Sequence, residues 1–212
     1  LEAEFENGVR VVGESKIFCC KKEQDCRIRQ VRLLPEHPRA LRAAAEAIEN
    51  ADMVVLGPGS LYTSIIPNLL VDGIVEAIQA SDGLKVYVCN VMTQEGETEG
   101  YTAADHIAAL FKHSVPGLFS LCLTNSSPIP RGVAARYAEE GAELIRCDRE
   151  RCAELGVEIV NRPVATVENG FVRHEPGHLA RELILLHAER SVRIAGAGSA
   201  GDFYRVEQPG GR

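Results

Sequence analysis

The stretch VLGPGSLYTSIIPNLL, residues 55–70, decides how the rest of the chain is interpreted. An apolar run ends abruptly at Gly57-Pro58-Gly59-Ser60, and a helix-compatible pattern interrupted by Pro67 follows it. Such an ending has two explanations. It is either a tight turn followed by an N-cap serine, or a loop whose backbone N–H groups approach an anion.

Two more apolar runs of the same kind follow, at 84–90 and 118–125. Apolar residues at helical spacing lie between them, over 68–80 and 101–114. Alternation of helices with near-continuous apolar strands is typical of a parallel sheet covered on both faces. The sequence therefore predicts an α/β fold with a mostly parallel sheet.

Local signals assign the remaining elements. Asn-Gly pairs with alternating flanks predict hairpins within 1–18 and at Asn169-Gly170. The polar segment CCKKEQDCR (19–27) is predicted to be a loop. Thr102 is the expected N-cap of the helix at 101–114. The other expected elements are strands at 30–35, 52–57, 142–148 and 157–167, and helices at 38–50 (starting at Pro38), 130–141 and 178–189.

No internal repeat or long linker divides the 212 residues. We therefore predict a single α/β domain over 1–190 and a flexible, Gly-rich tail over 191–212. GAGSAG (196–201) matches a dinucleotide-binding pattern. Such a site needs a helix and a second strand afterwards, so we assign this segment to the tail.

Composition and charge exclude several classes of protein. The formal net charge of -7 argues against broad binding of nucleic acid. No apolar run approaches the ~20 residues that cross a bilayer, and no leader opens the chain. The seven cysteines are an odd number and favour reduced thiols over a disulfide framework. We expect a cytoplasmic protein with no membrane span and no nucleic-acid partner.

Polar residues follow each of the three apolar strands. The clusters are Gly57–Ser60, then Asn90 and Met92–Gly96, then Thr124–Ser127. Ligands of open parallel sheets bind outside the carboxyl ends of the strands. We therefore expect these donors and backbone amides to bind a phosphate or a sugar. The competing interpretation is structural: a turn, and asparagines that satisfy strand-end carbonyls.

Other chemically active side chains are weaker candidates for a functional site. Asp105 and His106 are interpreted as a capping carboxylate and a surface histidine. The cysteines at 19, 20 and 26 lack the spacing and the fourth ligand of a zinc site. Arg173 either pairs bidentately with a phosphate or forms a surface ion pair of small energetic value.

Three stretches, at 51–78, 85–106 and 171–180, resemble the gluconeogenesis factor family. This is the YvcK-like branch of the 2-phospho-L-lactate transferase superfamily. The resemblance implies a Rossmann-like three-layer α/β sandwich that binds UDP-glucose or UDP-N-acetylglucosamine and requires no cofactor. It also implies a regulatory role in gluconeogenic growth, cell shape and cell-wall synthesis, with an unidentified cell-wall partner and no established catalysis.

The same resemblance carries over a set of ligand-binding residues. A tyrosine face can stack on a base or a sugar, and an arginine fork suits a diphosphate. The residues that match the family's positions are Gly57, Gly59, Ser60, Asn90, Thr93, Tyr137 and Arg173.

The chain departs from the family pattern in two ways. It lacks the family's N-terminal glycine-rich segment, so it is expected to be a fragment with an uncovered sheet edge that favours self-association. Glu175-Pro176 replaces a threonine that some relatives carry after Arg-His-Asp.

Two other functions stay open. One is a magnesium-dependent phospholactyl-type transferase, with Glu97 and Asp105 as the acids nearest the cleft. The other is a partner-binding scaffold with a vestigial pocket.

Overall fold

The computed structural model describes residues 1–24 and 26–199. The strands are β1 (Glu2–Phe5), β2 (Arg10–Val12), β3 (Ile28–Arg32), β4 (Met53–Leu56), β5 (Leu84–Val88), β6 (Leu121–Asn125), β7 (Glu158–Arg162), β8 (Ala165–Glu168) and β9 (Phe171–His174). The helices are α1 (Glu14–Gln24), α2 (Arg42–Glu49), the π-helix η1 (Leu61–Ile65), α3 (Ile66–Leu69), α4 (Ile74–Ala80), α5 (Ala103–Lys112), α6 (Arg131–Glu139), α7 (Arg149–Glu154) and α8 (Pro176–Ser199).

A parallel sheet in the order β4-β5-β6-β7 forms the centre of the fold. Successive residues of a strand point to opposite faces, and both faces of this sheet are buried. Tyr87 and Cys122 join a core with α5 on one face. Val86 and Leu123 pack with Leu183 of α8 on the other. The two buried faces explain the near-continuous apolar strands and confirm the predicted three-layer α/β architecture.

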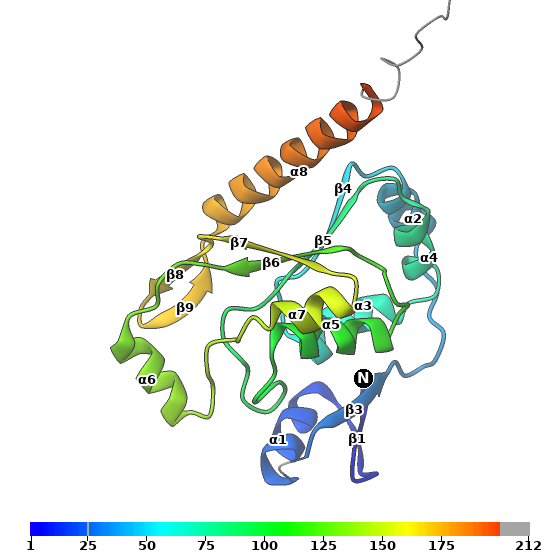
Figure 1. Cartoon of the computed structure of the whole chain (residues 1–212). Helices are drawn as coiled ribbons and strands as arrows, with labels where there is room; N and C mark the ends of the chain where they lie inside the picture. The colour runs from blue at the N-terminus through cyan, green and yellow to red at the C-terminus, as the bar shows by residue number, and fades with distance from the viewer. Residues whose placement is uncertain (25, 200–212) are drawn as a thin grey trace, which may run out of the picture.

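A second, antiparallel sheet in the order β2-β1-β3 lies below the helical layer that contains α5 (Figure 1). Its strands contribute Phe5 and Val31 to the same core as α5. The end of α5 holds β3 directly, because Lys112 Nζ donates to the carbonyl of Arg29 at 2.6 Å. The hairpin predicted around Asn7-Gly8 is confirmed as β1–β2, and that at Asn169-Gly170 as β8–β9.

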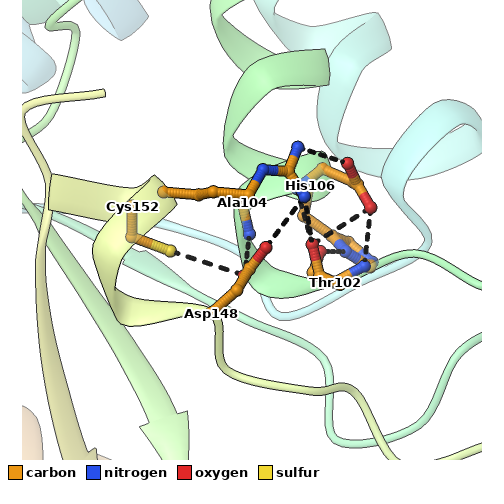
Figure 2. Close-up of polar contacts among 7 residues, drawn as sticks. Thr102, Ala104, His106, Asp148 and Cys152 are labelled. Carbon is orange, nitrogen blue, oxygen red and sulfur yellow. Dashed lines mark hydrogen bonds and ion pairs between the residues drawn. The ribbon is translucent and has the colours of Figure 1, made fainter. Parts of the chain in front are cut away.

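A polar network joins the beginnings of α5 and α7, as Figure 2 shows. Thr102 caps α5 as predicted and forms a capping box with Asp105. Asp148, the N-cap of α7, accepts a hydrogen bond from the amide of Ala104 at 2.9 Å. Arg151 then pairs with Asp148 at 2.9 Å and with Asp105 at 3.0 Å. One partly buried acid, Asp148, and one arginine, Arg151, therefore connect two helices that are far apart in sequence.

The predicted loop at 19–27 is wrong over most of its length, because Glu14–Gln24 form α1. Only a narrow line of this helix is buried, with Ile17 in the core and Lys21 paired with Glu99 at 3.2 Å. Phe18, at 40% exposed, interrupts the polar outer face of the helix. Two buried positions one turn apart are too few to produce a recognisable hydrophobic period.

Several other boundaries differ from the sequence-based predictions, and the strand expected over 157–167 is divided into β7 and β8, which lie in different sheets. The helix expected over 68–80 is divided into α3 and α4 by Gly73, which has a left-handed φ of 97°. The helix expected from Pro38 begins at Arg42, because residues 38–40 bond with Asp72 instead. The strand expected over 142–148 is wrong: a single bridge at Leu144 replaces it, and α7 follows.

The helix α8 is longer than the predicted 178–189 and continues to Ser199, past residue 191 where the predicted tail begins. Figure 1 shows the C-terminal part of α8 extending away from the sheet. Residues 200–212 of that tail lie outside the described residues. Among the described helices, none combines the length and the apolar character that a bilayer crossing needs. All seven cysteines are free thiols, as predicted.

Replacing Asp148 with alanine is expected to lower the free energy of unfolding at pH 7 by about 2 kcal/mol, because it removes two hydrogen bonds to a charged group. Burial raises the pKa of Asp148, but the Ala104 amide and the Arg151 charge outweigh it and hold that pKa below its usual value. A lowered pKa stabilises the fold above the unfolded-state value of 3.8, and this contribution disappears as the pH falls through the folded-state value.

Urea denaturation at pH 7 and pH 3 measures this difference. The matched control is Glu150→Ala, an exposed acid on the same helix, which should change stability little. Equal losses for both variants at pH 7 would contradict the role assigned to Asp148.

Candidate ligand-binding site

A cleft of about 550 Å³ lies at the carboxyl ends of β4 and β5. Four segments form its walls: the loop after β4, the segment after β5, helix α6 and strand β9. This is the edge at which parallel sheets bind ligands. Six of the seven predicted site residues line it, namely Gly59, Ser60, Asn90, Thr93, Tyr137 and Arg173.

The segment after β5 holds the loop after β4 through side-chain hydrogen bonds. Asn90 Nδ2 donates to the carbonyl of Gly59 at 3.0 Å. Ser60 Oγ donates to Gln94 Oε1 at 2.8 Å. Asn90 therefore satisfies a loop carbonyl, as the structural interpretation expected, while it also lines the cleft.

The anion that meets the helix after Ser60 is the carboxylate of Glu97. Glu97 is 2% exposed, and its Oε1 accepts from Thr63 Oγ1 at 2.7 Å. Its Oε2 accepts from the amide of Tyr62 at 3.3 Å. The unpaired N–H groups of a helix start favour negative charge. Both explanations of the opening stretch therefore hold in part: the chain turns there, and backbone N–H groups meet an internal anion.

Gly57 is the one predicted site residue that does not line the cleft. Its φ of 83° is left-handed, and an added Cβ would lie 3.0 Å from the carbonyl oxygen of Val88 and 3.1 Å from Ile65 Cδ1. Glycine is required here because the loop passes close to β5. The observed role of Gly57 is to form the turn.

Thr93 and Tyr137 fix two walls of the cleft to the rest of the fold. Thr93 Oγ1 accepts from the amide of Glu143 at 2.8 Å, and its own amide donates to the Glu143 carbonyl at 2.7 Å. Tyr137 Oη accepts from the amide of Val172 at 3.0 Å, so α6 is held against β9. Figure 1 shows α6 beside the β8–β9 hairpin.

Charged groups are unevenly distributed around the cleft. Among the described residues, Arg173 is the single arginine or lysine that lines it, and two carboxylates, Glu95 and Glu140, line it as well. His174 lies on the same wall, where its Nε2 is buried and has no hydrogen-bond partner among the described residues. Burial lowers the pKa of His174, which favours the neutral imidazole.

The third predicted cluster, Thr124–Ser127, does not line the cleft. Asn125 Oδ1 instead accepts from the amides of Ser127 at 2.9 Å and Ala165 at 3.0 Å, which joins the end of β6 to the start of β8. Asn125 therefore has a structural role, but its oxygen accepts from backbone amides, whereas the structural interpretation expected it to satisfy strand-end carbonyls. Thr124 and Asn125 line a separate small pocket that also includes Asn90, so this strand end adjoins the cleft without lining it.

Asp105 caps α5, as predicted, and His106 is fully buried at 0% exposure, so its assignment to the surface is wrong. His106 Nδ1 lies 2.9 Å from the carbonyl of Thr102. The ring of His106 also packs edge-on against Tyr101 at 5.6 Å. Sequence periodicity does not distinguish a buried histidine of this kind from an exposed one.

Two ionisable residues that line the cleft were not among the predicted site residues or polar clusters, namely Glu140 and His174. Glu140 follows the last residue of α6, one turn beyond Tyr137, so helical spacing from Tyr137 could have identified it. His174 follows Arg173 on β9 and should point to the opposite face by alternation. It lines the cleft nevertheless, and nothing in the sequence indicates this.

The comparison with protein families matches residues 1–165 to the model of 2-phospho-L-lactate transferase CofD. The chain belongs to the CofD family. Its relatives include the gluconeogenesis factor of Halalkalibacterium halodurans, 42% identical over 184 residues, and that of Bacillus subtilis, 42% identical over 189 residues. The X-ray crystal structure of protein BH3568 from Bacillus halodurans superposes with a TM-score of 0.81 at 42% identity.

This CofD-family chain spans a little over half the length of those relatives. The alignments cover 87% of the chain and 56% of the Halalkalibacterium protein, and 89% of the chain and 58% of the Bacillus subtilis protein. The superposition with the crystal structure covers 86% of this chain and 58% of the BH3568 chain. The predicted family and fold are confirmed at this level.

Replacing Glu97 with glutamine is expected to change how stability depends on pH. Burial raises the pKa of Glu97 above 4.5, although the Thr63 hydroxyl and the amides of η1 partly oppose the rise. A raised pKa stabilises the fold fully below the unfolded-state value of 4.5, and the contribution disappears as the pH rises through the folded-state value. Wild-type protein should therefore lose stability relative to Glu97→Gln from pH 4.5 upward.

Chemical denaturation of both proteins between pH 4.5 and pH 8 measures this difference. Glu154→Gln, at an exposed position on α7, serves as the control and should follow wild type. Parallel pH profiles for wild type and Glu97→Gln would show that Glu97 is not the titrating group.

Proposed function

We propose that this protein is a cytoplasmic regulator that binds a nucleotide sugar such as UDP-glucose or UDP-N-acetylglucosamine. The observation that carries the proposal is the convergence of six predicted site residues on one cleft. By its relation to the gluconeogenesis factors, the protein would influence gluconeogenic growth, cell shape and cell-wall synthesis. The open edge of the parallel sheet at β4 adds a proposal of self-association.

The chemistry of the cleft supports this class of ligand. Its volume of about 550 Å³ suits a molecule of nucleotide size. Tyr137 offers an aromatic face, Ser60 and Asn90 offer short polar groups, and Arg173 offers a guanidinium. These groups bind bases, sugar hydroxyls and phosphates respectively.

The magnesium-dependent transferase is the weaker proposal, although the family model carries the name of a transferase. The two acids considered for the metal do not fit that role. The Glu97 carboxylate is turned toward Tyr62 and Thr63, and Asp105 caps α5 and pairs with Arg151. Neither lines the cleft.

Titration with UDP-N-acetylglucosamine and UDP-glucose tests the proposed function. At about one hundred times the dissociation constant, the ligand should stabilise the protein by about 2.7 kcal/mol, seen as a rise in melting temperature. Arg173→Gln should weaken binding at least about tenfold by removing a charge-assisted contact to phosphate. Arg131→Gln, an exposed arginine on α6 outside the cleft, should leave binding unchanged.

Two outcomes would overturn the proposal. One is the absence of any thermal shift at millimolar concentrations of both sugars. The other is equal binding by wild type and Arg173→Gln, which would place the ligand elsewhere. Product formation from a nucleoside-diphosphate donor, abolished by EDTA, would support the transferase instead.

A further inference from the structure

Phe171 lies at the border of the cleft and contacts two guanidinium groups. The side chain is 48% exposed. Arg173 Cζ lies 5.3 Å from the ring centroid, and Arg136 Cζ lies 5.4 Å from it. Phe171 and Arg173 are two residues apart on β9, whereas Arg136 reaches the ring from α6. Two cations from different elements therefore meet at one aromatic ring.

Arg136 does not use the acids on its own helix. Glu139 and Glu140 follow it at the spacings at which helical ion pairs usually form. Arg42 and Glu46 form such a pair at 2.6 Å. No ion pair of Arg136 occurs among the described residues. Its guanidinium instead extends over Gly170, where an added Cβ would collide with Nη1.

Arg173 also lacks a carboxylate partner within the described part of the chain. Among the described residues, the Arg173 side chain forms one hydrogen bond, which its Nη1 donates to the carbonyl of Val172 at 3.2 Å. Arg151 and Arg162, by contrast, each pair with two carboxylates. Arg136 and Arg173 thus repel each other across one ring, and an oxyanion that contacts both would relieve the repulsion.

We propose that Arg136 and Arg173 bind the two phosphate groups of a nucleoside diphosphate, with Phe171 as the positioning residue between them. The inference rests on the proposed function, because it assigns the anionic part of the same ligand. Two linked phosphates give each guanidinium its own pair of oxygens for a bidentate contact. The ring lies within cation–π distance of both guanidinium groups and so keeps the two cations near each other.

The charge around the cleft also requires a second cation. Arg173 lines the cleft with two carboxylates, Glu95 and Glu140. One guanidinium among two carboxylates makes a poor receptor for a diphosphate. Arg136 does not line the cleft, but it contacts the same ring as Arg173 and would supply the second positive charge.

Calorimetric titration of the whole chain with UDP, UMP, uridine and inorganic pyrophosphate tests the inference. Arg136→Gln should weaken UDP and pyrophosphate at least about tenfold, because a charge-assisted contact is lost, and should leave uridine unchanged. Phe171→Leu should weaken the same two ligands, and Phe171→Tyr should restore them at unchanged melting temperature. Arg131→Gln is the matched control on α6 and should behave as wild type.

Each outcome decides between the two proposals. If wild type binds UDP and Arg136→Gln binds it equally well, the role of Arg136 is wrong and the proposed function stands. If wild type binds pyrophosphate through Arg136 but neither UDP nor a UDP-sugar, the anion site stands and the proposed function fails. If wild type binds neither the four probes nor a UDP-sugar at millimolar concentration, both fail. If Arg136→Gln and Arg131→Gln lower the affinity for UDP and pyrophosphate equally, the effect comes from net charge alone. That result would overturn the role assigned to Arg136.

Discussion

The cleft depends on the hydrogen bonds by which the segment after β5 holds the segment after β4. Asn90, Gln94 and Glu97 bond in turn to Gly59, Ser60 and the start of η1. Parallel pairing of β4 with β5 places the two segments at the same edge of the sheet. Without these side chains, the partly buried carbonyl of Gly59 and the N–H groups at the start of η1 would lose their hydrogen-bond partners, which is costly.

The layers were predictable from the sequence because the strands of the central sheet are buried on both faces. Because of that burial, most positions of β5 and β6 carry apolar residues, as is typical of parallel strands covered on both faces. The helix α5 was also predictable from the sequence, since Thr102 and Asp105 form a capping box. The helix α1 was not, because contacts with distant residues such as Glu99 stabilise it more than its own hydrophobic pattern.

The candidate site likewise contains residues that the sequence predicted and residues that it did not. Residues that follow strands were found because topology alone brings Ser60 and Asn90 to one edge of the sheet. Asn125 satisfies that rule and still lies outside the cleft, because its oxygen is needed by the amides that start β8. The resemblance to a family supplied Tyr137 and Arg173. Arg136 could not be found from sequence, because its relation to Arg173 exists only through Phe171.

The position of Glu97 constrains how a ligand could lie in the cleft. A helix start after a glycine-rich turn is a general site for phosphate, and here a carboxylate of the same chain occupies it. On the wall formed by the loop after β4, the Ser60 hydroxyl and the Gly59 carbonyl therefore already have hydrogen-bond partners within the protein, namely Gln94 and Asn90. The opposite border, formed by α6 and β9, carries two guanidinium groups without carboxylate partners among the described residues. Under the proposed function, the phosphates face α6 and β9, and the uncharged part of the ligand faces the loop.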